Sequence, residues 1–124
     1  MPKSADASNS QDSPSSDEAE LRVFIIGLLT DQDYKVDQEV AVRRGLHRRV
    51  VDVVAKGPKG TLLIEVRRQP ASIDAVSALA AAGWGKKFIV APSWADETSR
   101  SLAERSRITL VKPESLAANE QLPF

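Results

Sequence analysis

The stretch VVDVVAKGPKGTLLIEVRR, residues 50–68, decides the fold. It contains two apolar runs typical of buried β-strands, separated by the turn signal GPKG, and each run carries one carboxylate, Asp52 or Glu65. If Gly57 pairs with Gly60 across the turn, one face of the hairpin is entirely apolar and must be core. That face carries Val51, Val53 and Ala55 against Leu62, Ile64 and Val66. The other face places Asp52 directly opposite Glu65, with Arg67 diagonal to Asp52.

Two carboxylates opposed in a sheet repel each other, by part of the ~0.2–1 kcal/mol that such pairs contribute. A hard divalent cation would relieve the repulsion, because Mg²⁺ binds one or two carboxylates together with water and phosphate oxygens. The alternative is a solvent-facing sheet surface on which Arg67 bridges both acids and no metal binds. A type I turn with a bulge at Gly60 would instead set Asp52 opposite Val66, but this register pairs core with polar residues at every step.

The rest of the chain supplies elements on both sides of this hairpin. Apolar residues at helical spacing predict a first helix, which ends near 30–33 and carries Leu21, Phe24, Ile25, Leu28 and Leu29 on one stripe. Alternation predicts a strand over 34–42, followed by a basic connection over 43–49 and the two hairpin strands at about 49–56 and 61–68. A helix capped by Ser72, a strand in 86–92, a helix capped by Asp96 or Ser93 that runs to about 106, a strand at 108–112 and a helix opened by Pro113 follow. The order α-βββ-α-β-α-β predicts an α/β fold with a mixed central sheet.

Composition sets the domain limits. Residues 1–18 are rich in serine and contain no Val, Ile, Leu, Phe, Tyr or Trp, which predicts a disordered acidic tail. A single domain over 19–118 and a short C-terminal tail over 119–124 are expected to follow. The chain has no cysteine, and its longest apolar run, residues 23–29, is too short for a membrane span. We therefore expect a cytoplasmic protein, associated with the nucleoid if it binds DNA.

A zero net charge conceals a basic region. Residues 1–20 contain one Lys and five acids, so the remainder of the chain carries the compensating positive charge. Its candidate phosphate contacts are Arg43, Arg44, Arg48, Arg49, Arg68, Lys86 and Lys87. Such a surface suits a polyanion such as DNA, although a solvated charged face is the alternative.

The motif and the element order together resemble the PD-(D/E)xK nuclease superfamily, and within it Mrr-type endonucleases and archaeal Holliday-junction resolvases. The motif D-x₁₂-E-x-[basic] falls on Asp52, Glu65 and Arg67. The resemblance implies that Asp52, Glu65 and the backbone carbonyl of Val66 hold Mg²⁺ or Mn²⁺. It also implies that an acid of the first helix assists, for which Glu20 is the candidate and Glu18 the weaker one.

The important departure is Arg67, which stands where the family has lysine. A metal would activate a water and stabilise charge on phosphorus, and a lysine can orient that water, whereas arginine stays protonated. Arg67 can still bind a phosphate through both nitrogens, and Arg68 points to the opposite face in this register.

The resemblance implies a Mg²⁺-dependent DNA endonuclease, with Asp52, Glu65 and Arg67 as the catalytic residues. Its activity would be altered or weakened by Arg67. The alternative is a catalytically degenerate nuclease fold that binds DNA, and a third reading is a protein-interaction domain. Duplex or branched DNA is the expected partner, and by analogy paired cuts would need a homodimer.

Overall fold

The acid-bearing hairpin lies at the centre of a five-stranded mixed sheet. In the computed structural model, which describes residues 16–44, 47–118 and 124, the strand order is β1-β2-β3-β4-β5. The strands are β1 (Lys35–Arg44), β2 (His47–Gly57), β3 (Gly60–Val66), β4 (Lys86–Val90) and β5 (Ile108–Val111). The helices are α2 (Ser16–Asp31), α3 (Ile73–Ala80), α4 (Glu97–Arg105) and α5 (Pro113–Ala118). The first three strands are antiparallel and the last two are parallel to β3, which confirms the predicted mixed α/β sheet.

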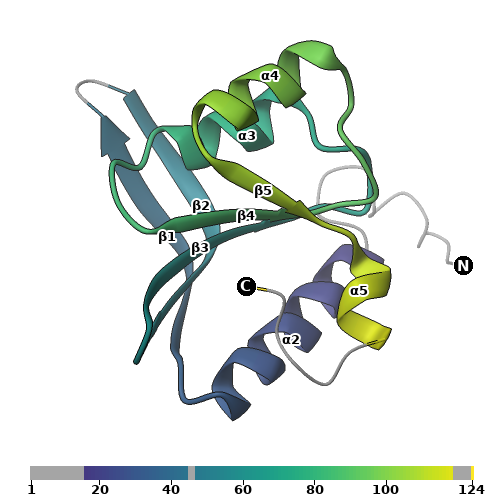
Figure 1. The fold of residues 1–124 in the computed structure, drawn as a ribbon. Coiled ribbons are helices and arrows are strands. Elements are labelled where there is room, and N and C mark those ends of the chain that lie inside the picture. Colours follow the sequence, from purple (N-terminus) through teal and green to yellow (C-terminus); the bar gives the residue numbers. More distant parts are fainter. Residues whose placement is uncertain (1–15, 45–46, 119–123) are drawn as a thin grey trace, which may run out of the picture.

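Helices cover both faces of this sheet. Helices α3 and α4 lie on one face, and α2 and α5 lie on the other (Figure 1). The first core cluster, which includes Val54, Leu63 and Leu79, packs beneath α3 and α4, and the second, which includes Val53 and Ile64, packs against α2. Both faces of the hairpin are therefore covered around the acids, and Glu65 is fully buried. The solvent-facing surface of the predicted alternative is wrong, but its bridging of both acids by Arg67 is confirmed.

The turn fixes the register that the sequence predicts. Gly57 pairs with Gly60, and the ladder continues regularly to the pair of Val53 with Ile64. Gly60 has a φ of 115°, a conformation that glycine adopts without steric cost. The register with a bulge at Gly60 is thereby excluded.

One residue beyond that ladder, the side chains of the hairpin begin to face the other core cluster. Val51 is fully buried in the first core cluster, whereas Val53 belongs to the second, so the prediction that they share one face is wrong. In β1 the same change separates Val36 from Val40, and between them Glu39 has a φ of 53°. The left-handed backbone of Glu39 lies opposite Asp52. At this point in both strands, the side chains that faced the second core cluster are replaced at the same alternating positions by side chains that face the first.

The arginines predicted to lie in a loop belong to strands instead. Strand β1 runs to Arg44 and β2 begins at His47, and Arg43 pairs directly with Arg48. The prediction of a connection over 43–49 is wrong, because cross-strand pairing continues to Arg44 and His47 and leaves two residues between the strands.

The two predicted tails lie largely outside the described residues. Most of the predicted N-terminal tail, and residues 119–123 of the C-terminal one, fall outside the described residues, although α2 already begins at Ser16. The ring centroid of Phe124 lies 4.9 Å from that of Phe88.

The first helix is only partly buried along its predicted stripe, where Ile25 and Leu29 are fully buried but Phe24 is 45% exposed. No helix within the described ranges is long and apolar enough to cross a membrane.

Candidate functional site

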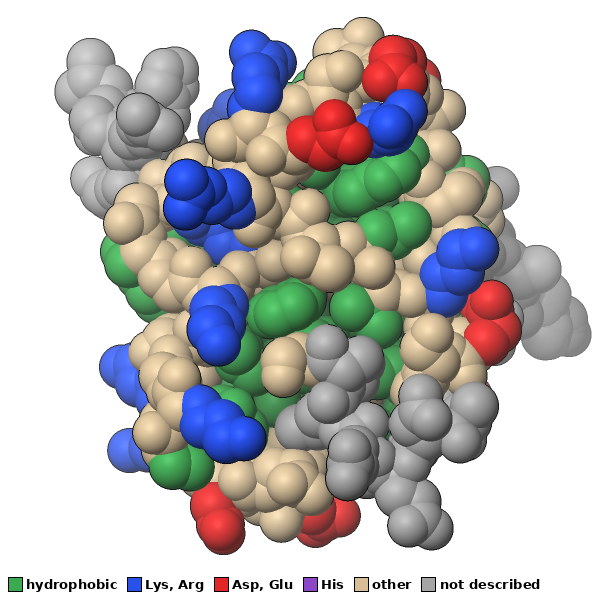
Figure 2. Space-filling model, in the orientation of Figure 1, with side chains coloured by type: hydrophobic (Ala, Val, Ile, Leu, Met, Phe, Trp, Pro, Cys, Tyr) green, Lys and Arg blue, Asp and Glu red, His purple; other side chains and the backbone are tan. Residues whose placement is uncertain are grey.

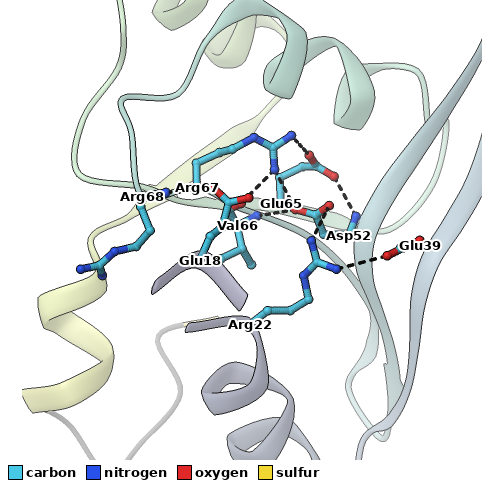
Figure 3. Close-up of polar contacts among 8 residues, drawn as sticks. All are labelled: Glu18, Arg22, Glu39, Asp52, Glu65, Val66, Arg67 and Arg68. Atoms are coloured by element: carbon cyan, nitrogen blue, oxygen red, sulfur yellow. Dashed lines mark hydrogen bonds and ion pairs between the residues drawn. The ribbon is translucent and has the colours of Figure 1, made fainter. Parts of the chain in front are cut away.

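The two acids meet where β2 and β3 separate. Beyond Val53 and Ile64 the carboxylates replace backbone carbonyls as cross-strand acceptors (Figure 3). The backbone N–H of Asp52 donates to Glu65 Oε1 at 2.8 Å, and the backbone N–H of Val66 donates to Asp52 Oδ2 at 2.9 Å. Each carboxylate thus satisfies a backbone donor of the opposite strand, a group that would be costly to bury without a partner.

Arg67 contacts both acids and the neighbouring carbonyl through one guanidinium. Its Nη1 donates to Asp52 Oδ2 and to the Val66 carbonyl, both at 2.8 Å, and its Nη2 donates to Glu65 Oε2 at 2.7 Å. The backbone N–H of Arg67 donates to the carbonyl of Val90 at 2.8 Å, which extends the pairing of β3 with β4 by one residue. The predicted approach of Asp52, Glu65 and Arg67 is therefore confirmed as a placement, while their catalytic roles stay predictions.

A second arginine reaches the pair from helix α2. Arg22 Nη2 lies 3.3 Å from Asp52 Oδ1, and its Nη1 lies 3.5 Å from Glu39 Oε2. The Arg22 side chain is only 14% exposed, and its buried Nε has no hydrogen-bond partner. Sequence reasoning missed this residue, although its spacing from the buried Ile25 and Leu29 places it on the face of the helix that packs against the sheet.

Burial dominates the titration of Glu65. Its side chain is fully buried. This burial is the largest cause that raises the pKa of Glu65, to about 7, and repulsion from Asp52 is the next. Arg67 and the backbone N–H of Asp52 act in the opposite direction and lower the pKa. For Arg67, burial acts to lower the pKa, but attraction to Glu65 and Asp52 outweighs it and the pKa lies above its ordinary value. Arg67 is therefore charged at every physiological pH.

The predicted metal ligands can be tested against these contacts. Asp52, Glu65 and the Val66 carbonyl offer oxygen atoms of the kind that Mg²⁺ accepts. Each of these oxygens already has a nitrogen partner, and the point between them is filled by the Arg67 guanidinium. No group of three or more His, Cys, Asp or Glu suited to a metal ion occurs among the described residues. In this arrangement the residues do not fit a divalent cation.

The two candidate acids of the first helix differ in position. Glu20 is exposed, and within the described part of the chain it forms no hydrogen bond or ion pair with Asp52 or Glu65. Glu18 accepts a long hydrogen bond of 3.4 Å from the backbone N–H of Arg68, and its charge contributes to the raised pKa of Arg67. The weaker candidate is therefore the one placed beside the site. The exposed side chain of Arg68 points away from the acids (Figure 3).

The predicted DNA contacts separate into two groups. Arg48 and Arg49 are exposed on β2, on the side of Asp52 that leads to the β1–β2 connection, and the side chains of Arg43 and Arg44 are not described. Lys86 and Lys87 pair with the opposite end of β3, whose Glu65 aligns with Ile89. The predicted residues therefore do not form one continuous stripe beside the acids.

Comparison with known proteins gives the fold. No family model matches the chain, and no curated protein matches it. A repair endonuclease from Pyrococcus abyssi matches with a TM-score of 0.55 at 23% identity, over 81% of this chain and 47% of that chain. EndoMS in complex with double-stranded DNA matches with a TM-score of 0.56 at 21% identity, over 79% and 44%. The chain has a restriction-endonuclease-like fold.

A further match has a different ligand. Can2 from Sulfobacillus thermosulfidooxidans, solved with cyclic tetra-adenylate, matches with a TM-score of 0.58 at 12% identity, over 82% of this chain and 33% of that chain. The chain spans less than half the length of each of these three proteins. At such identities the likeness establishes the nuclease fold, and membership of the PD-(D/E)xK superfamily stays a prediction.

Proposed function

We propose that this chain is a DNA-binding domain of nuclease fold that holds the phosphate backbone with the arginines of its β1–β2 hairpin. The observation that carries this proposal is the exposure of the neighbouring Arg48 and Arg49 on β2, where the backbone of Arg48 pairs with that of Arg43. Clustered basic residues on an exposed strand create a positive potential. A bound phosphate backbone would offset it.

The surroundings of the hairpin support the same function. Arg48 and Arg49 are exposed, and neither forms an ion pair with an acid in the described part of the chain. Figure 2 shows Lys and Arg side chains over much of one face, most of them on its left side and others at its top and right, where Asp and Glu side chains also lie. Phosphate contacts from such residues supply affinity without sequence preference. Double-stranded DNA bound to the structurally similar EndoMS adds support for DNA as the partner.

The acid pair is compatible with this function because its charge is balanced. Asp52 and Glu65 contact Arg67 and Arg22, so even when both acids are ionised two arginines match their charge. A bare acid pair three residues from Arg49, roughly 10 Å along an extended strand, would repel the phosphates that the hairpin attracts. With Arg67 and Arg22 bound to it, the acid pair does not repel these phosphates.

A Mg²⁺- or Mn²⁺-dependent DNA endonuclease, of Mrr or Holliday-junction-resolvase type, is the second candidate. The convergence of Asp52, Glu65 and the Val66 carbonyl on one point favours it, since these are the residues for which the motif implies metal binding. Incubation of linear and four-way-junction DNA with Mg²⁺ or Mn²⁺ separates the candidates. Cleavage that disappears with Asp52→Ala would establish the endonuclease, and binding without cleavage is the result that the first candidate predicts.

Binding itself is tested by titrating labelled duplex and four-way-junction DNA at several salt concentrations. The wild-type affinity should fall steeply with salt, and each of Arg48→Ala and Arg49→Ala should lower the magnitude of the log–log slope by about 1. Lys112→Ala is the matched control, because this exposed lysine follows β5, at the opposite edge of the sheet from β1. Equal losses in all three variants, or no binding at low salt, would contradict the proposal. The homodimer stays a prediction that sedimentation with and without DNA would test.

A further inference from the structure

Three oxygens from different groups converge on a single side chain in this molecule. Asp52 Oδ2, Glu65 Oε2 and the Val66 carbonyl each accept from the Arg67 guanidinium at 2.7–2.8 Å (Figure 3). These are charge-assisted hydrogen bonds, which are shorter and stronger than neutral ones. A planar guanidinium can bind two acids at once because its nitrogens form a rigid fork.

We propose that Arg67 is the built-in cation of this site, and that it takes the place a divalent metal ion would occupy between Asp52 and Glu65. The proposal follows from the contacts of the acid pair and does not depend on DNA binding. It assigns Arg67 a role different from that of a residue that contacts substrate phosphate while a metal holds the acids.

The position of Arg67 makes this replacement stable. Its backbone is fixed to β4 through Val90, and its side chain returns over the two residues before it to reach Glu65 and Val66. Arg22 pairs with the remaining oxygen of Asp52 from another element. The acid pair is thus compensated from two sides, and a metal entering between the acids would have to displace a guanidinium that is already held by three oxygens.

The same geometry predicts what removal of the guanidinium would do. Without it, Glu65 remains fully buried beside Asp52, and two carboxylate oxygens and one carbonyl oxygen face the space that is freed. Two carboxylates with a carbonyl and water are a ligand set that Mg²⁺ and Mn²⁺ accept. Replacement of Arg67 by a neutral side chain should therefore create a metal site that the wild type lacks.

The test measures thermal unfolding of the full chain with and without MnCl₂, using no DNA and no activity. Arg67→Met should have a low melting temperature that rises by at least about 4 °C in millimolar Mn²⁺, whereas the wild type should not shift. Arg68→Met is the matched control, because the adjacent arginine is exposed and points away, and it should behave as the wild type does.

A second variant covers the case in which Arg67→Met does not fold without metal. Arg67→Lys keeps one positive charge but cannot bridge both acids, so it should fold and gain a smaller, still measurable, shift in Mn²⁺. Adding Asp52→Asn to either variant should abolish the gain. A wild type that Mn²⁺ stabilises as much as it stabilises the variants would overturn the proposal, and so would Arg67 variants that fold and gain nothing.

Discussion

The two ends of the β2–β3 hairpin are held by different means. At the turn end, from the pair of Gly57 with Gly60 to the pair of Val53 with Ile64, backbone groups bond to backbone groups in a regular ladder. At the open end, carboxylates accept the backbone N–H groups of Asp52 and Val66, and an arginine holds the carboxylates. A ladder needs only extended backbone and a suitable turn, whereas the open end depends on the identity of individual side chains.

This difference assigns the two acids a structural task. They join strands whose backbones no longer pair directly. Arg67, which follows β3, forms ion pairs with both carboxylates. Substitutions at the open end should therefore act through charge, and those at the turn end through packing and backbone shape. Three predictions test that distinction.

The largest effect is expected for Arg67→Met, which removes the cation and leaves Glu65 buried next to Asp52. Breaking one partner of a buried ion pair costs about 3–5 kcal/mol, so we expect a loss of about 4 kcal/mol in the free energy of unfolding at pH 8. Urea denaturation followed by circular dichroism measures it. The exposed neighbour in Arg68→Met should change stability by less than about 0.5 kcal/mol. Comparable losses in the two variants would contradict a special role for Arg67.

The next effect is a pH dependence that arises at Glu65. Its pKa is raised from 4.5 to about 7 in the folded chain, so folding favours the protonated acid. Its contribution to stability is complete below pH 4.5 and is lost as the pH rises through about 7. Relative to Glu65→Gln, which cannot ionise, the wild type should lose about 3 kcal/mol between pH 4 and pH 8. Parallel urea midpoints for the two proteins across this range would show that Glu65 does not titrate as described.

The smallest effect is expected at the turn end, from Gly57→Ala. A Cβ at Gly57 would collide with the ring of Tyr34, which packs against the second core cluster. Forcing an extra carbon into packed surroundings typically costs about 1–3 kcal/mol, and we expect about 2 kcal/mol. This loss should be equal at pH 5 and pH 8, because no charged group is involved. A loss that changes with pH would mean that the turn end is coupled to the acid pair.

The sequence predicted the turn end well and the open end only in part. The two glycines and the alternation of apolar residues determine the register, and this register brings Asp52, Glu65 and Arg67 together. The reversal of faces could not be read from the pattern, because it depends on the positive φ of Glu39 and on bonds from side chains to backbone.

Two further features depend on tertiary packing. Arg22 reaches Asp52 only because α2 packs beneath the separated strands, and its charge looks like that of any solvated helix residue in the sequence. The arginines of residues 43–49 suggest a loop because charged residues and a glycine are common there, but pairing across the strands includes all but two residues of that stretch.

The central claim, that an arginine takes the place of a metal ion, is tested most directly by titrating Mn²⁺ into the wild-type chain in an isothermal calorimeter, beside Arg67→Met. The account predicts no saturable heat for the wild type at millimolar Mn²⁺ and one site per chain in Arg67→Met. One saturable site in the wild type that is lost in Asp52→Asn would contradict it, because the metal and Arg67 would then share the acid pair.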